Sequence, residues 1–230
     1  MKITKLEAWP VAMELKEPYT IAYETVSKTT NVFFRIETST GVSGLGCAAP
    51  DEVVTRETAA TVLAALTDVV TPLFKGCDPL RRLSLITRLR KHLPDAPSAR
   101  AAADMALHDL LGKAAGLPLW RVLGGFRRSI ATSITIGILD EGETVARARD
   151  FAERGFRAIK IKGGRNHEED AEKVLKVREA VGPRIEIRFD ANQGYTVEQA
   201  LAFVEKSKSA NVAILEQPTP KESPDLMGRM

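Results

Sequence analysis

The sequence predicts an α/β protein in which an α+β domain is followed by the first half of a (β/α) barrel. The two-glycine break Gly124-Gly125 separates a front part of mixed pattern from a back part in which strand-like and helix-like runs alternate strictly. In the back part, charged residues end three successive strand-like runs. We therefore expect one domain at residues 1–124 and a partial barrel domain at residues 125–230.

The front part begins with segments that alternate apolar and polar residues, which is typical of half-buried strands. They lie at residues 2–12, 31–38 and 42–47. Thr40-Gly41 makes the turn between the last two, so an antiparallel meander is the simplest arrangement. Helical periodicity follows at residues 52–71, 79–92 and 98–115.

The back part alternates strands and helices. The expected strands are at residues 130–136, 156–161, 185–190 and 211–215, and the expected helices at about 141–154, 167–181 and 196–208. Such alternation requires parallel strands with right-handed crossovers, in either a doubly wound sheet or a barrel. Charged residues at the carboxyl ends of neighbouring strands converge on one mouth, which favours the barrel.

Composition excludes several functional classes. The net charge is only +3, from 33 basic and 30 acidic residues, so nucleic-acid binding has little electrostatic support. Cys47 and Cys77 show neither a CxxC spacing nor the density of a disulfide scaffold, which indicates a reducing compartment. No uninterrupted apolar stretch approaches the length of a membrane span. We predict a cytoplasmic protein with neither nucleic-acid nor membrane partners.

The motif Lys160-Ile161-Lys162 ends the second strand of the back part. A spacing of two places both lysines on one face of the strand. Each ammonium group disfavours the charge of the other, which would lower a lysine pKa toward the range of a general base. The alternative is a strand end with two solvated lysines.

Carboxylates at the next two strand ends favour the functional interpretation. Asp190 and Glu216 are hard oxygen ligands, which suit Mg²⁺ or Mn²⁺ rather than zinc. Asn192, two residues after Asp190, is a candidate contact to a ligand or substrate, and an Asx turn explains it equally well. A metal beside an amine base predicts removal of the proton α to a substrate carboxylate, through an enediolate intermediate. The residues leave open whether reprotonation, elimination or ring opening follows.

Four patches of the chain resemble the enolase superfamily, in its mandelate racemase and muconate lactonizing enzyme branch. They are residues 106–113 continuing to Leu123-Gly124-Gly125, Ile159-Lys160-Ile161-Lys162, Phe189-Asp190-Ala191-Asn192 and Leu215-Glu216-Gln217-Pro218. The resemblance implies a capping domain and a modified TIM-type barrel. It also implies that Asp190 and Glu216 bind Mg²⁺, that Lys162 is the base, and that Lys160 holds the substrate carboxylate and tempers Lys162.

Within this branch, residues 18–23 and 132–136 are similar to dipeptide epimerases of the Ala-Glu type. That similarity implies a small-molecule carboxylate substrate, a dipeptide, covered by a lid from Tyr19 to Tyr23 and contacted by Thr135. Ordinary loop anchoring explains the tyrosines equally well, and threonine is common in strands. Muconate-type cycloisomerisation, N-acyl amino acid racemisation and o-succinylbenzoate synthesis are the alternative reactions.

The family pattern includes a third metal ligand, a second base and specificity residues on later strands, which residues 1–230 do not contain. The fourth strand of the back part would also be left as an apolar edge. We therefore predict either a truncation of a longer enzyme or a homo-oligomer of half barrels. The alternative from another class is an inactive fragment that serves as a binding module.

Overall fold

The structure is a computed structural model that describes residues 1–20, 25–221 and 224–229. The chain divides into two compact units. The first contains Met1–Glu14 and Lys28–Arg128, and the second contains Leu15–Ser27 and Ser129–Met230. The middle of the first hairpin, which the sequence placed in the front domain, therefore groups with the second unit.

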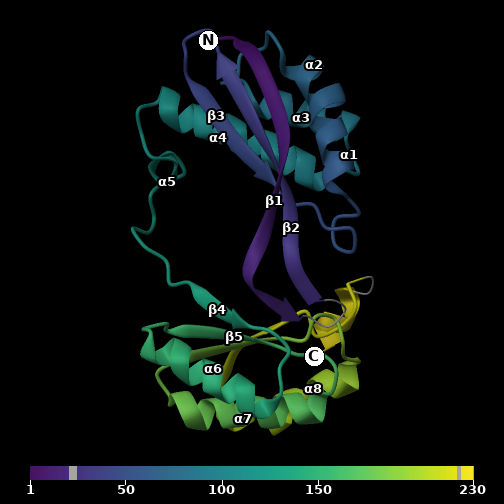
Figure 1. Ribbon diagram of the computed structural model, residues 1–230, viewed down its shortest axis with the longest axis vertical. Coiled ribbons are helices and arrows are strands. Elements are labelled where there is room, and N and C mark those ends of the chain that lie inside the picture. Colours follow the sequence, from purple (N-terminus) through teal and green to yellow (C-terminus); the bar gives the residue numbers. More distant parts are fainter. Residues whose placement is uncertain (21–24, 222–223, 230) are drawn as a thin grey trace. The chain divides into compact units, whose positions relative to one another are not determined.

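The first unit contains an antiparallel sheet in the order β1-β2-β3 (Figure 1). Its strands are β1 (Ile3–Thr20), β2 (Thr25–Thr38) and β3 (Ser43–Ala48). Phe34 lies opposite Gly46 in the antiparallel pairing of β2 with β3. The predicted meander is confirmed. Strand β1 runs well beyond the predicted end at residue 12, because exposure continues to alternate through Met13–Lys16.

Helices pack against this sheet. They are α1 (Ala59–Ala64), the π-helical turn η1 (Ala65–Val70), α2 (Thr71–Phe74), α3 (Arg82–His92), α4 (Pro97–Ala114) and α5 (Leu119–Val122). The predicted start at residue 52 is wrong, because the Asp51 carboxylate accepts the backbone N–H groups of Val53 and Val54 and holds a turn there. The helix begins only after Thr58, whose hydroxyl caps it.

Helix α4 packs closely on β3 within the core of the first unit. A side chain at Gly46 would place its Cβ 1.9 Å from the Ala102 carbonyl oxygen, so only glycine allows this approach. The buried Glu57 carboxylate accepts the N–H groups of Ser98, at 2.8 Å, and Ala99, at 3.3 Å. It thereby satisfies backbone donors at the start of α4.

The second unit is a parallel sheet in the order β4-β5-β6-β7, as predicted. Its strands are β4 (Ser133–Ile136), β5 (Ala158–Lys162), β6 (Glu186–Asp190) and β7 (Val212–Glu216). Helices α6 (Glu141–Glu153), α7 (His167–Val181) and α8 (Val197–Lys206) cover one face (Figure 1). Short 3₁₀ turns occur at Lys208–Ala210 and Pro224–Arg229. Capping side chains begin all three helices, at Asp140, Asn166 and Thr196.

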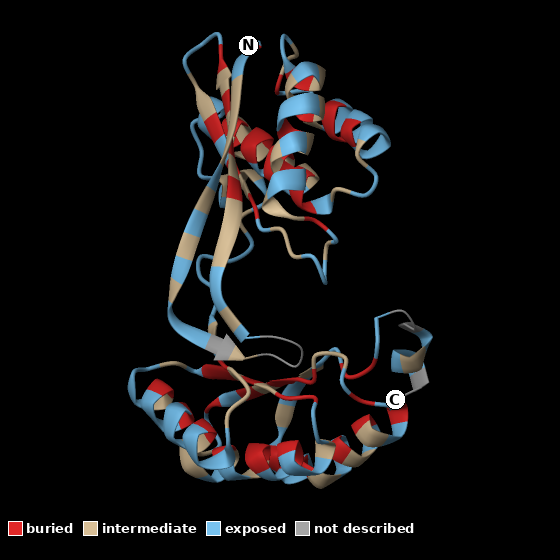
Figure 2. Cartoon of the chain, turned by 45° about the vertical axis from the view of Figure 1, so that its right-hand side comes forward, coloured by how far each residue is buried: buried red, intermediate tan, exposed pale blue. Residues whose placement is uncertain are grey.

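Buried residues concentrate where the helices of each unit meet its sheet (Figure 2). In the second unit, Ile159, Ile161 and Phe189 are fully buried on the helix side of the sheet. Alternation along the strands then turns the intervening residues to the other face, which these helices do not cover. Among the described residues, no helix is both long and apolar enough to cross a membrane.

Candidate active site

Strand register places the predicted site residues on the face of the sheet opposite α6, α7 and α8. Lys162 pairs in register with Asp190, and Asp190 with Glu216. Residues in register on neighbouring parallel strands project to the same face, so the three side chains form a row at the carboxyl ends of β5, β6 and β7. Lys160 lies two residues before Lys162 and is on this face too.

Four charged side chains meet there. The Lys160 Nζ lies 2.9 Å from Asp190 Oδ2 and 2.7 Å from Glu216 Oε2. The Lys162 Nζ donates to the same Asp190 Oδ2 at 2.7 Å. Asp190 has only 1% of its side chain exposed, whereas Glu216 has 45%. The structure therefore brings together all four residues that the sequence assigned to catalysis and metal binding.

The electrostatics of this cluster differ from the expectation for Lys160. Burial lowers the pKa of the Lys160 ammonium, but hydrogen bonds to Glu216 and Asp190 outweigh burial, so the pKa is raised. The two ammonium groups alone would lower this pKa, and the carboxylates that lie between them reverse the direction. For Asp190, burial raises the pKa, and hydrogen bonds from Lys162 and Lys160 outweigh it, so the pKa is lowered.

The loops after β6 and β7 carry strained backbone. Asn192, Gln193 and Gln217 have positive φ angles of 47°, 67° and 42°. Such conformations are costly outside glycine and cluster at functional sites. The Asn192 N–H donates to Asp190 Oδ1 at 2.9 Å, whereas its own Oδ1 is buried without a hydrogen-bond partner. That free acceptor is available to a ligand, and the role of Asn192 in substrate binding stays a prediction.

The remaining predicted substrate contacts are placed only in part. Thr135 is exposed on β4 and pairs in register with Lys160, so the two residues share one face of the sheet. Tyr23 and the side chain of Tyr19 lie outside the described part of the structure. The predicted lid therefore stays a prediction.

The donor set fits a divalent cation with hard oxygen ligands. The carboxylates of Asp190 and Glu216 come close enough to share one positive group, since the Lys160 ammonium contacts both. Within the described ranges, no group of three or more His, Cys, Asp or Glu residues could hold a metal. The chain thus offers two carboxylates to Mg²⁺ or Mn²⁺, which bind few protein ligands and keep waters.

Sequence reasoning missed a buried carboxylate behind this row. Asp170, in α7, is 4% exposed and accepts hydrogen bonds from the Gly164 N–H at 2.9 Å and the Tyr195 hydroxyl at 2.7 Å. A signal was present, because Asp170 precedes the buried Val174 and Val177 at helical spacing and so lies on the apolar face of α7. An acidic residue on such a face requires partners.

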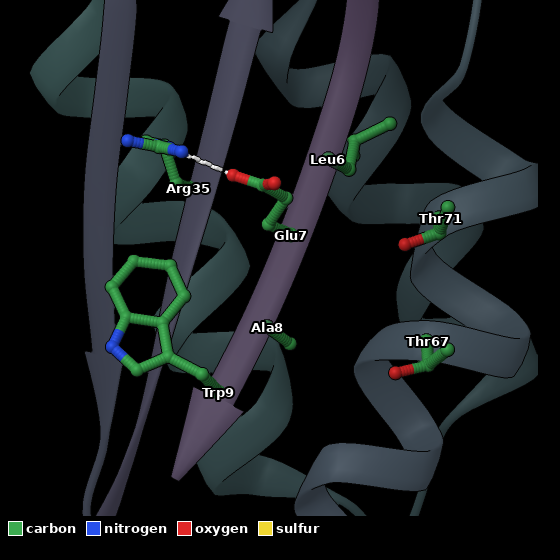
Figure 3. A pocket seen from close by; sticks show the side chains of 7 residues that line it. All are labelled: Leu6, Glu7, Ala8, Trp9, Arg35, Thr67 and Thr71. Carbon is green, nitrogen blue, oxygen red and sulfur yellow. Dashed lines mark hydrogen bonds and ion pairs between the residues drawn. The ribbon is translucent and has the colours of Figure 1, made fainter. Parts of the chain in front are cut away.

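A separate hollow lies in the first unit (Figure 3). It is lined by Leu6, Glu7, Ala8, Trp9, Arg35, Thr67 and Thr71. Its charged groups are already paired, because the Arg35 guanidinium donates to Glu7 and lies 5.9 Å from the centre of the Trp9 ring. It contains none of the predicted site residues, so the strand ends of the second unit remain the candidate active site.

Comparison with known families agrees with this arrangement. Residues 3–124 match the family described as mandelate racemase / muconate lactonizing enzyme, N-terminal domain. The chain belongs to this family. Residues 143–230 match the enolase C-terminal domain-like family, so the predicted enolase superfamily membership and the predicted fold class are confirmed.

Relatives within the superfamily include epimerases. The chain is 43% identical over 230 residues to the L-Lys-D/L-Arg epimerase of Desulforapulum autotrophicum, covering 100% of this chain and 65% of the relative. It is 32% identical over 231 residues to the L-Ala-D/L-Glu epimerase of Bacillus subtilis, covering 99% and 63%. The chain therefore spans slightly less than two thirds of the length of the curated relatives it matches.

A solved relative carries ligands. The crystal structure of the dipeptide epimerase from Methylococcus capsulatus, complexed with Mg and the dipeptide L-Arg-D-Lys, superimposes with a TM-score of 0.95 at 36% identity. The similarity covers 100% of this chain and 65% of that one. The similarity therefore includes both units of this chain, and the ligands of that enzyme in its crystal structure are Mg and a dipeptide.

Proposed function

We propose that the protein to which this chain belongs is a metal-dependent dipeptide epimerase that removes the proton α to a substrate carboxylate. The observation that carries the proposal is the row of Lys162, Asp190 and Glu216 in register at the ends of three parallel strands, with Lys160 between the two carboxylates. Epimerase relatives over the whole length of the chain support it.

Each site residue of the chain would have a separate role in this reaction. Lys162 accepts the α-proton as general base, within reach of the cation site through its contact with Asp190. Lys160 pairs with the substrate carboxylate and orients it. Asp190 and Glu216 hold Mg²⁺, and Mn²⁺ is the alternative. When bound there, the cation would supply stabilisation of the negative charge that develops on the substrate carboxylate. Thr135, Asn192, Tyr19 and Tyr23 are the proposed contacts to the rest of the substrate.

Two dipeptide classes are candidates. The Ala-Glu type follows from the sequence motifs of residues 18–23 and 132–136. The higher identity to an L-Lys-D/L-Arg epimerase, 43% against 32%, favours a cationic dipeptide. L-Ala-L-Glu and L-Lys-L-Arg, offered at equal concentration, distinguish the two classes by their relative kcat/KM. A homo-oligomer in the cytoplasm is part of the proposal.

The test is exchange of the substrate α-proton with solvent deuterium, followed by NMR with Mg²⁺ present. We expect Lys162→Ala to lower exchange by about 10²–10⁴-fold with folding intact. Lys176→Ala is the matched control, because that lysine is half exposed and pairs with Glu179 at the surface. Exchange that is absent from the wild-type protein to which this chain belongs, with Mg²⁺ saturating, would refute the proposed function. Exchange that persists in Lys162→Ala would refute the assigned base.

A further inference from the structure

One tyrosine connects the three loops that follow the site strands. Its hydroxyl reaches Asp170, which also holds the Gly164 N–H in the loop after β5. Its own backbone belongs to the loop after β6, and its N–H donates to the Pro218 carbonyl in the loop after β7, at 3.0 Å. The residue is Tyr195, and it is only 3% exposed.

The loop after β5 has little freedom to move while these contacts hold. The Gly163 N–H donates to the Asp190 carbonyl at 2.9 Å, which joins the chain just after Lys162 to the strand that carries the first carboxylate. A Cβ at Gly164 would lie 1.9 Å from the Ala191 carbonyl oxygen. The loop is therefore held between Asp170 on one side and the chain after Asp190 on the other.

The partners of this contact suit a rigid support. Tyr195 stacks on Phe189, with ring centroids 6.5 Å apart. The rings of His167 and Tyr195 form a T-shaped pair with centroids 6.2 Å apart. Burial and the charge of Asp170 raise the pKa of the Tyr195 hydroxyl, so it stays a neutral donor across the ordinary pH range. The Lys173 ammonium lies 3.7 Å from the other Asp170 oxygen and compensates its charge.

We propose that Asp170 and Tyr195 are positioning residues, which fix the loop after β5 and thereby the direction of the Lys162 amine relative to Asp190 and Glu216. This inference rests on the proposed function for its catalytic consequence. In the described part of the structure, neither residue is hydrogen-bonded to the side chain of Lys162, Asp190 or Glu216. Their hydrogen bond acts through Gly164, which follows Lys162 by two residues, and through the backbone link from Tyr195 to the loop after Glu216.

Tyr195→Phe tests the proposal, because it removes the hydroxyl and keeps the stacked ring. We expect deuterium exchange of the substrate α-proton to fall about tenfold in kcat with KM within twofold, since the loss of a hydrogen bond to a charged group reorients the base. We expect the Gly164 amide to exchange with solvent about tenfold faster in native-state hydrogen exchange. Asp170→Asn should change both quantities in the same direction.

The matched control is Ser207→Ala. That hydroxyl is equally buried and donates to the Phe203 carbonyl at 2.7 Å, in a part of the second unit that has no contact with the loop after β5 among the contacts described above. An unchanged kcat in Tyr195→Phe, or an equal fall in Ser207→Ala, would overturn the proposal.

Failure of the proposed function gives a different pattern. If the wild type shows no α-proton exchange, the epimerase activity fails for this chain, and the positioning role is decided by Gly164 amide exchange and by the affinity for Mn²⁺. Faster amide exchange with about tenfold weaker Mn²⁺ binding in Tyr195→Phe would support the positioning role. Unchanged values of both would refute it.

Discussion

The two units use close backbone contact at glycine for different purposes. In the first unit, Gly46 allows α4 to lie directly on β3, where the neighbouring groups are apolar and unreactive. In the second unit, Gly164 brings the loop after β5 onto the Ala191 carbonyl, next to a charged cluster. The same feature supports packing in one unit and sets the geometry of the candidate site in the other.

The units also differ in how they treat charge. Arg35 and Glu7 pair on the first unit with 42% and 35% of their side chains exposed. Lys160, Lys162 and Asp190 pair on the second unit with only 18%, 14% and 1% exposed. An exposed pair contributes little, whereas a buried group that loses its partner is costly. The comparison predicts that charge changes affect the second unit more strongly.

The largest expected effect is that of Gly164→Ala. The new Cβ meets a carbonyl oxygen at 1.9 Å, and the φ angle of +102° is unfavourable for alanine. We expect a loss of about 3 kcal/mol in the free energy of unfolding, from overpacking and backbone strain together. Mn²⁺ binding should weaken at the same time. Denaturant titration and calorimetric titration measure the two quantities.

Gly142→Ala is the control for this substitution. Its Cβ would find only the Asp140 carboxylate, at an ordinary 3.5 Å, and Gly142 lies in α6 with an ordinary φ angle. We expect unchanged or slightly increased stability, because alanine has a higher helix propensity than glycine. A Gly164→Ala variant as stable as this control would contradict the close contact.

Gly46→Ala tests the corresponding close contact in the first unit. The clash with the Ala102 carbonyl should cost about 2 kcal/mol of stability through overpacking. Mn²⁺ affinity should stay within twofold of the wild type, because the first unit contributes none of the carboxylates of the candidate site. Weakened Mn²⁺ binding in the folded variant would show that the two units are coupled, and the division of roles would be wrong.

The regular part of the fold could be predicted from the sequence because its signals are periodic. Four parallel strands and the helices between them followed from the alternation of strand-like and helix-like runs. The start of the first helix could not, because the Asp51 carboxylate holds a turn there through contacts that a helical pattern does not reveal. The first strand was predicted to end too early, at residue 12, and the part of it from Leu15 onward groups with the second unit.

The candidate site divides in the same way. Lys162, Asp190 and Glu216 could be found because each ends an apolar run, and parallel strands bring their ends together. Asp170 does leave a signal, since it lies on the apolar face of α7. Its pairing with Tyr195 could not be predicted, because it depends on one hydrogen bond between residues 25 positions apart. The direction of the Lys160 pKa shift depends on which oxygens the ammonium contacts, and side-chain contacts of that kind are a property of the folded site.

Lys160→Met tests the charge comparison directly. It removes the ammonium that lies between Asp190 and Glu216, at 2.9 Å and 2.7 Å, and leaves the two carboxylates to a divalent ion. We expect Mn²⁺ to bind about tenfold more tightly, which corresponds to about 1.4 kcal/mol. Arg35→Met, which breaks the exposed pair with Glu7, should leave Mn²⁺ affinity unchanged. Weaker Mn²⁺ binding in Lys160→Met would argue against a shared position for the cation and the ammonium.

The smallest expected effect is the protonation of Glu17, which lies in the part of the first hairpin that groups with the second unit. Arg147 donates to the exposed Glu17 carboxylate at 2.6 Å and lowers its pKa, first through this hydrogen bond and then through its charge. A lowered pKa in the folded state means that the contribution is present above the unfolded value and is lost as the pH falls through the folded one. The Ile138 N–H, which donates to the Thr20 carbonyl at 2.8 Å, reports on this contact. Its NMR shift should be constant from pH 7 to about pH 5 and change below about pH 4, and Arg147→Gln should move that step to higher pH. A step at the same pH in Arg147→Gln would assign the acid response to a different carboxylate.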